Sequence, residues 1–187
     1  MSENSRRFVQ ALYTLDAVAR RVPDNAWDNQ SCCSDWTARE VAGHAAWVIG
    51  NIGAMTGNAE APEAKPEAEV AGADPAAAIG AAISSTAAAI DQQGVLHQVT
   101  ATPFGEMSID TFLGTIWVDS LTHAWDIADA TGVAHGIDQP TAEAAYAALE
   151  PVSEALRGPG RFDDPIDVPT DAVARFIGFT GRTSVSS

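Results

Sequence analysis

The stretch "IDTFLGTIWVDSLTHAWDIADATG", residues 109–132, decides the fold class. Its apolar residues recur at intervals of three and four, which predicts an α-helix over Ile109–Ala130 with Gly132 at its C-cap. On a helical wheel, Asp119 and His123 lie one turn apart within the same band as the apolar side chains. A hydrophobic core accepts neither group without a partner, because burying it alone costs several kcal/mol. The pair therefore needs an explanation inside the protein.

Three explanations for the pair remain open: a plain ion pair, partial solvation at one end of a bundle, or metal ligation. A further histidine bears on the choice, because His44 follows the capping box "TARE" and shares a helical stripe with Val41 and Val48. Together, His44, Asp119 and His123 offer three protein ligands and leave one position open, which is the pattern of catalytic zinc sites. Zn²⁺ is the preferred metal, with Ni²⁺ or Fe²⁺ as alternatives, because imidazole suits all three.

Other polar residues are weaker candidates. His97 and His135 fall in non-helical stretches and are expected at the surface. Asp126 lies near the edge of the inward face, where it either orients a metal ligand or hydrogen-bonds the backbone at a helix junction. Cys32 and Cys33 are neighbours, and a bond between them would strain the intervening peptide. We expect two half-buried loop residues, with a reactive thiol as the alternative.

The rest of the chain predicts an all-α protein, a four-helix bundle with additions. A short extended or hairpin-like excursion over residues 95–108 precedes the helix that begins at Ile109, and the stretch 57–75 is expected to be a mobile linker. The other predicted helices are Glu3–Val22, Thr37–Met55, Pro75–Gln93, Thr141–Leu156 and a short C-terminal one, Asp171–Phe179. Glycines within the second helix cost roughly 1 kcal/mol each relative to Ala, and a close approach of a neighbouring helix would explain them.

Composition narrows the function classes. A chain of 187 residues with 46% hydrophobic residues predicts a single domain over 1–187. The net charge of −15, without any basic run, argues against nucleic acid and anionic membrane surfaces as partners. The N-terminus lacks the apolar stretch of a signal peptide, and the chain lacks a long apolar run, so a cytoplasmic protein is expected.

Three motifs carry a resemblance: "WDNQSCCSDWTAREVAGHAAWV" (27–48), "SLTHAWDIADATG" (120–132) and "FIGFTGR" (176–182). They resemble the DinB/YfiT-like superfamily and, within it, the actinobacterial group that contains the N-terminal domain of mycothiol-dependent maleylpyruvate isomerase. The resemblance implies an up-and-down four-helix bundle with a divalent metal, usually zinc, held at one end. Carried over residue by residue, the ligands are His44, Asp119 and His123, with Asp119 where the family often has Glu.

The resemblance further implies a metal-dependent enzyme in which a low-molecular-weight thiol, mycothiol, attacks an electrophilic substrate. The reaction would be an S-transfer or an isomerisation, and a homodimer is a possible assembly. Trp47, Met55 and Phe112 are expected to line an apolar cleft. The alternatives are a non-catalytic metal- or ligand-binding bundle and a metal-dependent hydrolase.

Overall fold

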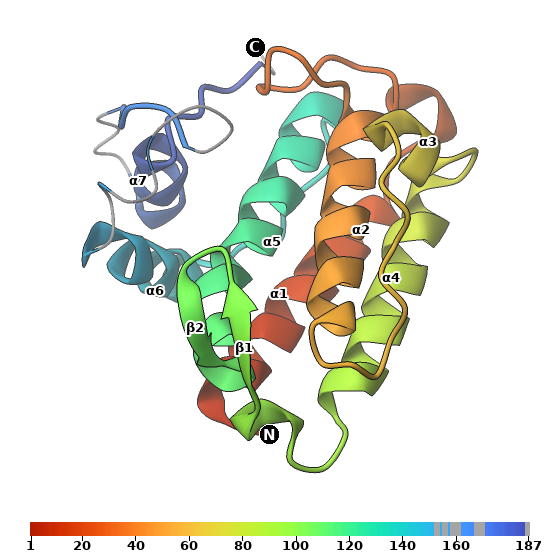
Figure 1. The fold of residues 1–187 in the computed structure, drawn as a ribbon. Coiled ribbons are helices and arrows are strands. Elements are labelled where there is room, and N and C mark those ends of the chain that lie inside the picture. Colours follow the sequence, from red (N-terminus) through yellow and green to blue (C-terminus); the bar gives the residue numbers. More distant parts are fainter. Residues whose placement is uncertain (152–153, 155–156, 158–161, 167–170, 186–187) are drawn as a thin grey trace.

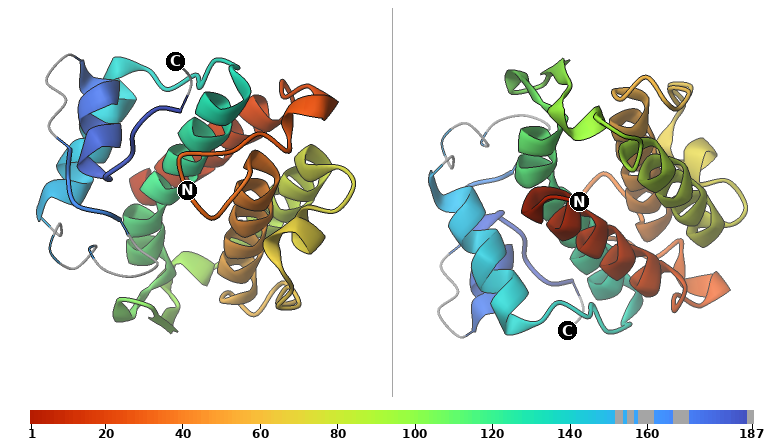
Figure 2. Two further views of the ribbon diagram at one scale, coloured as in Figure 1. Left: turned by 90° about the horizontal axis from the view of Figure 1, so that it is seen from above. Right: turned by 90° about the horizontal axis from the view of Figure 1, so that it is seen from below.

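The long helices of the chain form a bundle in the computed structural model, which describes residues 1–151, 154, 157, 162–166 and 171–185 (Figure 1). Helix α1 packs along α5, and α2 packs along α4. Contacts between α2 and α5 and between α1 and α4 close the ring, and Figure 2 shows the arrangement from both ends. The four helices are α1 (Glu3–Ala19), α2 (Ala38–Ala54), α4 (Pro75–Ile90) and α5 (Ile109–Thr131). The predicted all-α bundle is confirmed.

Local capping signals set the boundaries of these helices. Thr37 and Glu40 form the predicted capping box of α2, in which each side chain accepts a hydrogen bond from the other residue's backbone N–H. Asp74 caps α4 by accepting from the Ala77 N–H. Gly132 ends α5 in the left-handed conformation, with a φ of 72°. Helix α5 therefore starts and stops almost where its sequence predicts.

The additions lie on the flanks of the bundle. Strands β1 (Val99–Thr102) and β2 (Gly105–Ser108) pair antiparallel, which confirms the hairpin-like excursion before α5. Helices α6 (Gln139–Leu149) and α7 (Ala172–Phe179) pack against each other. The predicted C-terminal end of the α6 helix at Leu156 lies outside the described residues. Two single-turn 3₁₀ helices, η1 (Asp24–Ala26) and η2 (Val95–His97), complete the described elements.

The segment predicted as a linker contains a short helix, α3 (Glu67–Ala71), that packs against α2. Gly43 of α2 makes this packing possible, because a Cβ at that position would overlap the carbonyl of Glu67. A Cβ at Gly53 would similarly lie 2.7 Å from the Thr86 hydroxyl of α4. Gly43 and Gly53 thus mark close approaches of neighbouring helices, as the sequence suggested, whereas Gly50 faces Pro62 of the non-helical segment before α3.

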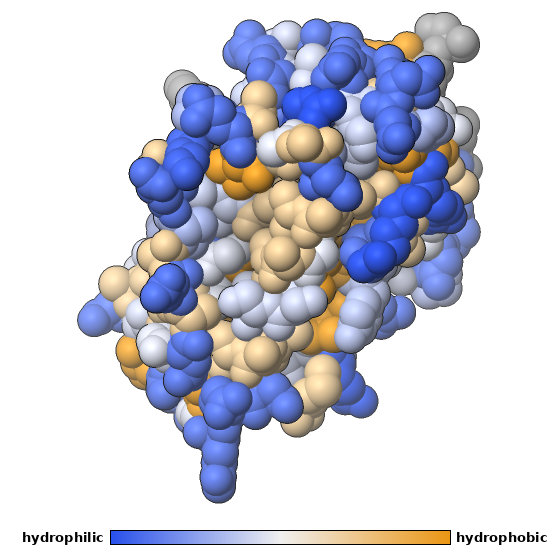
Figure 3. Space-filling model, turned by 90° about the vertical axis from the view of Figure 1, so that its right-hand side faces the viewer, coloured by the Kyte–Doolittle hydropathy of each residue, from blue (hydrophilic) through white to orange (hydrophobic). Residues whose placement is uncertain are grey.

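Fully buried aliphatic and aromatic side chains from all four long helices fill the centre of the bundle, among them Phe8, Leu12, Val41, Ile49, Ile79, Leu113 and Ile127. The side of the molecule formed by α3 and α4 has a pale, weakly hydrophobic surface bordered by hydrophilic side chains (Figure 3). The part of α4 that is exposed to solvent includes alanines such as Ala77, Ala81 and Ala88. Among the described residues, no helix combines the length and the apolar character that crossing a membrane requires.

Candidate metal centre

A cleft of about 500 Å³ lies beside the first half of α2 and the second half of α5. Its lining includes all three predicted metal ligands together with residues of the loop before α2 and of the segment after α7. The lining residues are Cys32, Cys33, Ser34, Asp35, Trp36, His44, Asp119, His123, Phe162, Asp163, Gly181 and Arg182. Its aromatic wall is formed by Trp36 and Phe162. The expectation for Trp47, Met55 and Phe112 was wrong: Met55 is the C-cap of α2 and Phe112 lies in the first turn of α5, both away from the cleft.

The structure brings the three predicted ligands to this one cleft. Asp119 Oδ1 lies 3.6 Å from His123 Nε2, which is too far for a good hydrogen bond. The rings of His44 and His123 meet edge to face, with centroids 5.1 Å apart. His44 also contacts Trp36, whose ring centroid is 4.7 Å away. His123 is buried, whereas Asp119 and His44 are partly exposed to the cleft.

Asp126 decides how His123 is oriented. The carboxylate is completely buried, and its Oδ2 lies 3.0 Å from His123 Nδ1. An ionised carboxylate can only accept, so Nδ1 carries the proton and donates it to Asp126. In the neutral ring the lone pair is then on Nε2, the atom that faces Asp119. Of the two sequence alternatives for Asp126, the structure supports the orienting role.

Arg182, in the segment that follows α7, supplies the positive charge that balances the Asp126 carboxylate. Its guanidinium donates two hydrogen bonds to Asp126, from Nε to Oδ1 at 2.6 Å and from Nη2 to Oδ2 at 3.1 Å. This bidentate ion pair is buried and joins the C-terminal segment to α5 across 56 residues of chain. The interaction satisfies a carboxylate that would otherwise be very costly to bury.

These contacts shift several pKa values. Burial by itself raises the pKa of Asp126, but the charges of Arg182 and His123 outweigh it and hold the pKa below its ordinary 3.8. Burial by itself lowers the pKa of His123, but the carboxylates of Asp119 and Asp126 outweigh it and raise the pKa above 6.5. Burial, and then the neighbouring His123, lower the pKa of His44 to about 4. His44 is therefore neutral at physiological pH, with a lone pair free to bind a metal.

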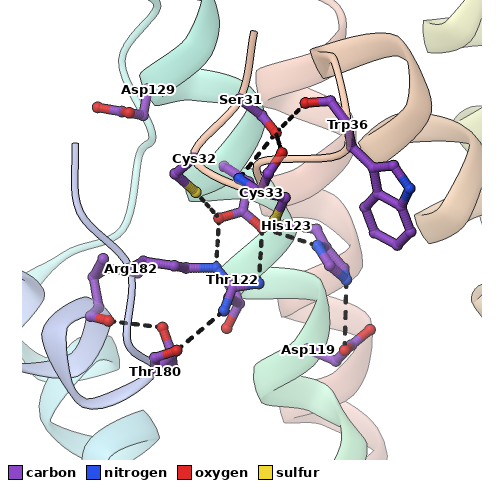
Figure 4. A network of polar contacts seen from close by, with 12 residues as sticks. Ser31, Cys32, Cys33, Trp36, Asp119, Thr122, His123, Asp129, Thr180 and Arg182 are labelled. Carbon is purple, nitrogen blue, oxygen red and sulfur yellow. Dashed lines mark hydrogen bonds and ion pairs between the residues drawn. The ribbon is translucent and has the colours of Figure 1, made fainter. Parts of the chain in front are cut away.

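The loop before α2 presents two thiols to the same carboxylate (Figure 4). The thiol of Cys32 donates to Asp126 Oδ1 at 3.1 Å, and the sulfur of Cys33 lies 3.9 Å from Oδ2. Both cysteines are free and half-buried, as predicted. The neighbouring Cys32 and, to a smaller extent, Arg182 lower the pKa of Cys33 to about 7, whereas the pKa of Cys32 is raised. Cys33 is thus the thiol that loses its proton more readily.

Donor spacing separates two possible metal-binding groups. Among the described residues, the donor atoms that lie within 4.8 Å of one another belong to Cys32, Cys33 and Asp126. The three predicted ligands do not form so compact a group in the structure. Of the three, Asp119 and His123 have donor atoms close to each other. Two ligands about 2.1 Å from one zinc ion in tetrahedral geometry are about 3.4 Å apart, close to the observed 3.6 Å.

A family model described as the mycothiol maleylpyruvate isomerase N-terminal domain matches residues 8–128, a region that includes His44, Asp119 and His123. The chain belongs to this family. Two uncharacterized proteins of Mycobacterium tuberculosis, MT0763 of strain CDC 1551 / Oshkosh and Rv0738 of strain ATCC 25618 / H37Rv, are similar to it. Each is 32% identical over 157 residues, which cover 80% of this chain and 83% of the relative. No solved structure matches the chain significantly.

Family membership confirms the resemblance that the motifs around His44 and His123 indicated. The matched region ends before Arg182, a residue that sequence reasoning did not assign to the site. The only sequence signal for Arg182 was its place at the end of "FIGFTGR". Of the other histidines, His97 is exposed as predicted, whereas His135 is half-buried and accepts a hydrogen bond from the Ile137 N–H. Neither lines the cleft.

Proposed function

We propose that this member of the mycothiol maleylpyruvate isomerase N-terminal domain family is a metal-dependent enzyme that uses a low-molecular-weight thiol, mycothiol by family membership. The metal, Zn²⁺ with Ni²⁺ or Fe²⁺ as alternatives, would be held by His44, Asp119 and His123. The observation that carries the proposal is the contact between Asp119 and His123, which is too long for a hydrogen bond and suits two ligands of one ion. The reaction would be an S-transfer to an electrophile or a thiol-dependent isomerisation.

The chemistry of the donor set fits a divalent metal. His44 is neutral, His123 presents Nε2, and Asp119 adds a single negative charge. A metal with three protein ligands offers a further coordination position, where a thiol is deprotonated to the thiolate near neutral pH. The proposal needs no protein nucleophile.

The chain's own residues would orient both the site and its substrate. Asp126, itself held by Arg182, would keep the His123 ring in one orientation, with Nε2 facing the cleft. Trp36 and Phe162 provide apolar walls for the body of a ligand. The buried sides of the cleft would exclude part of the water around a thiolate and so raise its reactivity.

The first prediction concerns the ligands. Protein purified without chelator is expected to carry about one divalent metal per chain, because three protein ligands define one site. The variants His44→Ala and His123→Ala should lose this metal, as measured by elemental analysis, while circular dichroism shows an intact bundle. His135→Ala is the matched control and should keep the metal. Full occupancy in both ligand variants would contradict the assignment.

The thiol is tested after cobalt replaces the native metal. The protein used is the double variant Cys32→Ser, Cys33→Ser, so that a sulfur-to-cobalt charge-transfer band can come only from added thiol. Mycothiol should produce this band, and its apparent affinity should rise with pH while the free thiol titrates. If cobalt occupies the site and no small thiol changes its spectrum, the thiol-dependent function is wrong. The hydrolase and the non-catalytic bundle are then the remaining functions.

A further inference from the structure

Cys32 and Cys33, here called the thiol pair, lie beside the candidate metal centre but take no part in the proposed reaction. Their sulfurs lie within 4.8 Å of each other, and both contact the carboxylate of Asp126. Two adjacent residues seldom present both side chains to one point. The described backbone achieves this without a cis peptide bond and without a positive φ at either cysteine.

A network of hydrogen bonds fixes the shape of this loop. The Ser31 hydroxyl donates to the Trp36 carbonyl at 2.6 Å, and the Trp36 N–H donates to the Cys33 carbonyl at 2.9 Å. The Gln30 amide donates to the Trp36 carbonyl at 2.9 Å and lies within 3.2 Å of the Cys33 carbonyl. The isolated β-bridge between Gln30 and Thr37 closes the loop at its base. Because these contacts use only groups of the loop itself, the loop holds both thiols in place.

Chelation of one ion strains this loop less than a disulfide would. A bond between neighbouring cysteines needs a sulfur separation of about 2.05 Å and strains the peptide between them, and both cysteines are free in the structure. Two sulfurs that each lie about 2.3 Å from a shared metal ion are about 3.8 Å apart in tetrahedral geometry and about 4.6 Å apart in a linear one. Donor atoms that lie within 4.8 Å of one another are compatible with either geometry.

We propose that the thiol pair is a second metal site, which binds a soft d¹⁰ cation of low coordination number, Cu⁺ in type, through the two sulfurs of Cys32 and Cys33. Thiolates select soft ions over hard ones. Two thiolates by themselves suit an ion of low coordination number, because both oxygens of the neighbouring Asp126 already accept hydrogen bonds from Arg182 and Oδ2 also accepts one from His123.

The local charge also favours a cation. Asp126 is already paired with Arg182 and His123, so two thiolates beside it would place two further negative charges next to each other in a half-buried position. Without an ion, repulsion between the thiolates opposes the loss of both protons. A cation between the sulfurs removes this repulsion and releases the protons to solvent. The inference does not depend on the proposed function, because it uses none of the three ligands assigned there.

The test measures Cu⁺ affinity without oxygen, by competition with a chromophoric Cu⁺ chelator. Wild type should bind one equivalent, and Cys32→Ser and Cys33→Ser should each lose more affinity than the roughly 100-fold that removal of an outer hydrogen-bond partner costs. Serine keeps the hydroxyl hydrogen bond to Asp126, so folding should survive both changes. The matched control is His44→Ala, which should lose zinc and keep its Cu⁺ affinity.

Three results would overturn the inference. Equal loss of Cu⁺ in His44→Ala would mean that cysteines and histidines hold a single ion. Dependence on only one of the cysteines would mean a single thiol rather than a chelating pair. Displacement of zinc by Cu⁺, one ion for one, would also contradict a separate site, whereas protein holding one equivalent of each ion at the same time supports it. Failure of the zinc site alone, with Cu⁺ binding intact, would count against the proposed function only.

Discussion

At the scale of single residues, Asp126 connects every part of the cleft. Its two oxygens accept hydrogen bonds from His123, Arg182 and Cys32, which lie on three separate segments of chain. Removing one partner of a buried ion pair is strongly destabilising, because the remaining charge stays buried without compensation. Removal of the Asp126 charge is therefore expected to act both on stability, through Arg182, and on the proposed metal binding, through the orientation of His123.

The variant Asp126→Asn tests both effects. It leaves the Arg182 guanidinium buried without its countercharge, so the free energy of unfolding at pH 7 should fall by about 3–5 kcal/mol in urea titrations. Zinc affinity should fall by roughly 10–100-fold, because the amide holds His123 less firmly. The matched control Asp91→Asn, at an exposed C-cap, should change neither.

At acidic pH, the difference in free energy of unfolding between wild type and Asp126→Asn should become smaller. The folded pKa of Asp126 lies below the unfolded value, so the stabilisation is present above about pH 4 and is lost as the pH falls through the folded pKa. The two unfolding free energies should therefore approach each other as the pH falls below 4. A difference that stays constant between pH 7 and pH 3 would contradict the ionised state of Asp126.

The pH dependence of zinc binding follows from His123. The raised pKa means that metal-free His123 keeps its proton to a higher pH than a free imidazole does, and the resulting ion pairs stabilise the metal-free protein below pH 6.5 and are lost as pH rises through the folded pKa. Zinc must displace this proton, so zinc affinity should increase with pH from 6 to 8 in chelator-competition titrations. His44, with a pKa of about 4, adds no proton release in this range. An affinity that is independent of pH would count against His123 as a ligand.

At the scale of elements, a backbone contact fixes the position of α3 on α2. Gly43→Ala adds a Cβ that overlaps the Glu67 carbonyl, a backbone atom that cannot move without shifting α3. The variant should lose about 1–3 kcal/mol of stability in urea titrations, although alanine is the better helix former. The control Gly80→Ala, within α4, meets only the ends of the Arg20 and Asp16 side chains and should be neutral or stabilising by up to about 1 kcal/mol. Equal effects of both substitutions would show that close packing at Gly43 is unimportant.

At the scale of the whole molecule, the proposed metal joins α2 to α5, whereas the Asp126–Arg182 pair joins α5 to the segment after α7. The hydrophobic core between the four long helices does not depend on either link. The bundle should therefore stay folded without metal, with its stability reduced.

Chelation tests this expectation. With zinc at about 1,000 times its Kd, binding contributes about 4 kcal/mol, so treatment with EDTA should lower the Tm by roughly 8–16 °C. The helical circular dichroism signal at 25 °C should be unchanged. His44→Ala provides the control, because its Tm should not respond to zinc or to EDTA. Loss of helix on chelation would mean that the metal is needed for folding itself.

The sequence by itself determined the elements and the inward faces. Apolar spacing of three and four, the Thr37–Glu40 capping box and Gly132 are local signals, and they predicted α2 and α5 to within a few residues. The same spacing assigned Asp119, His123 and His44 to inward positions, because a helical wheel needs no knowledge of the partner helix. Family resemblance then assigned these residues as ligands.

Only the tertiary structure decided which distant groups meet those residues. Cys32 reaches Asp126 across 94 residues of chain, and Arg182 reaches it across 56, so no local periodicity could relate them. The packing of the 31–36 loop and of the segment after α7 against α5 brings both groups to one buried carboxylate. The energetic need to satisfy that charge, once it is buried, is what fixes the arrangement.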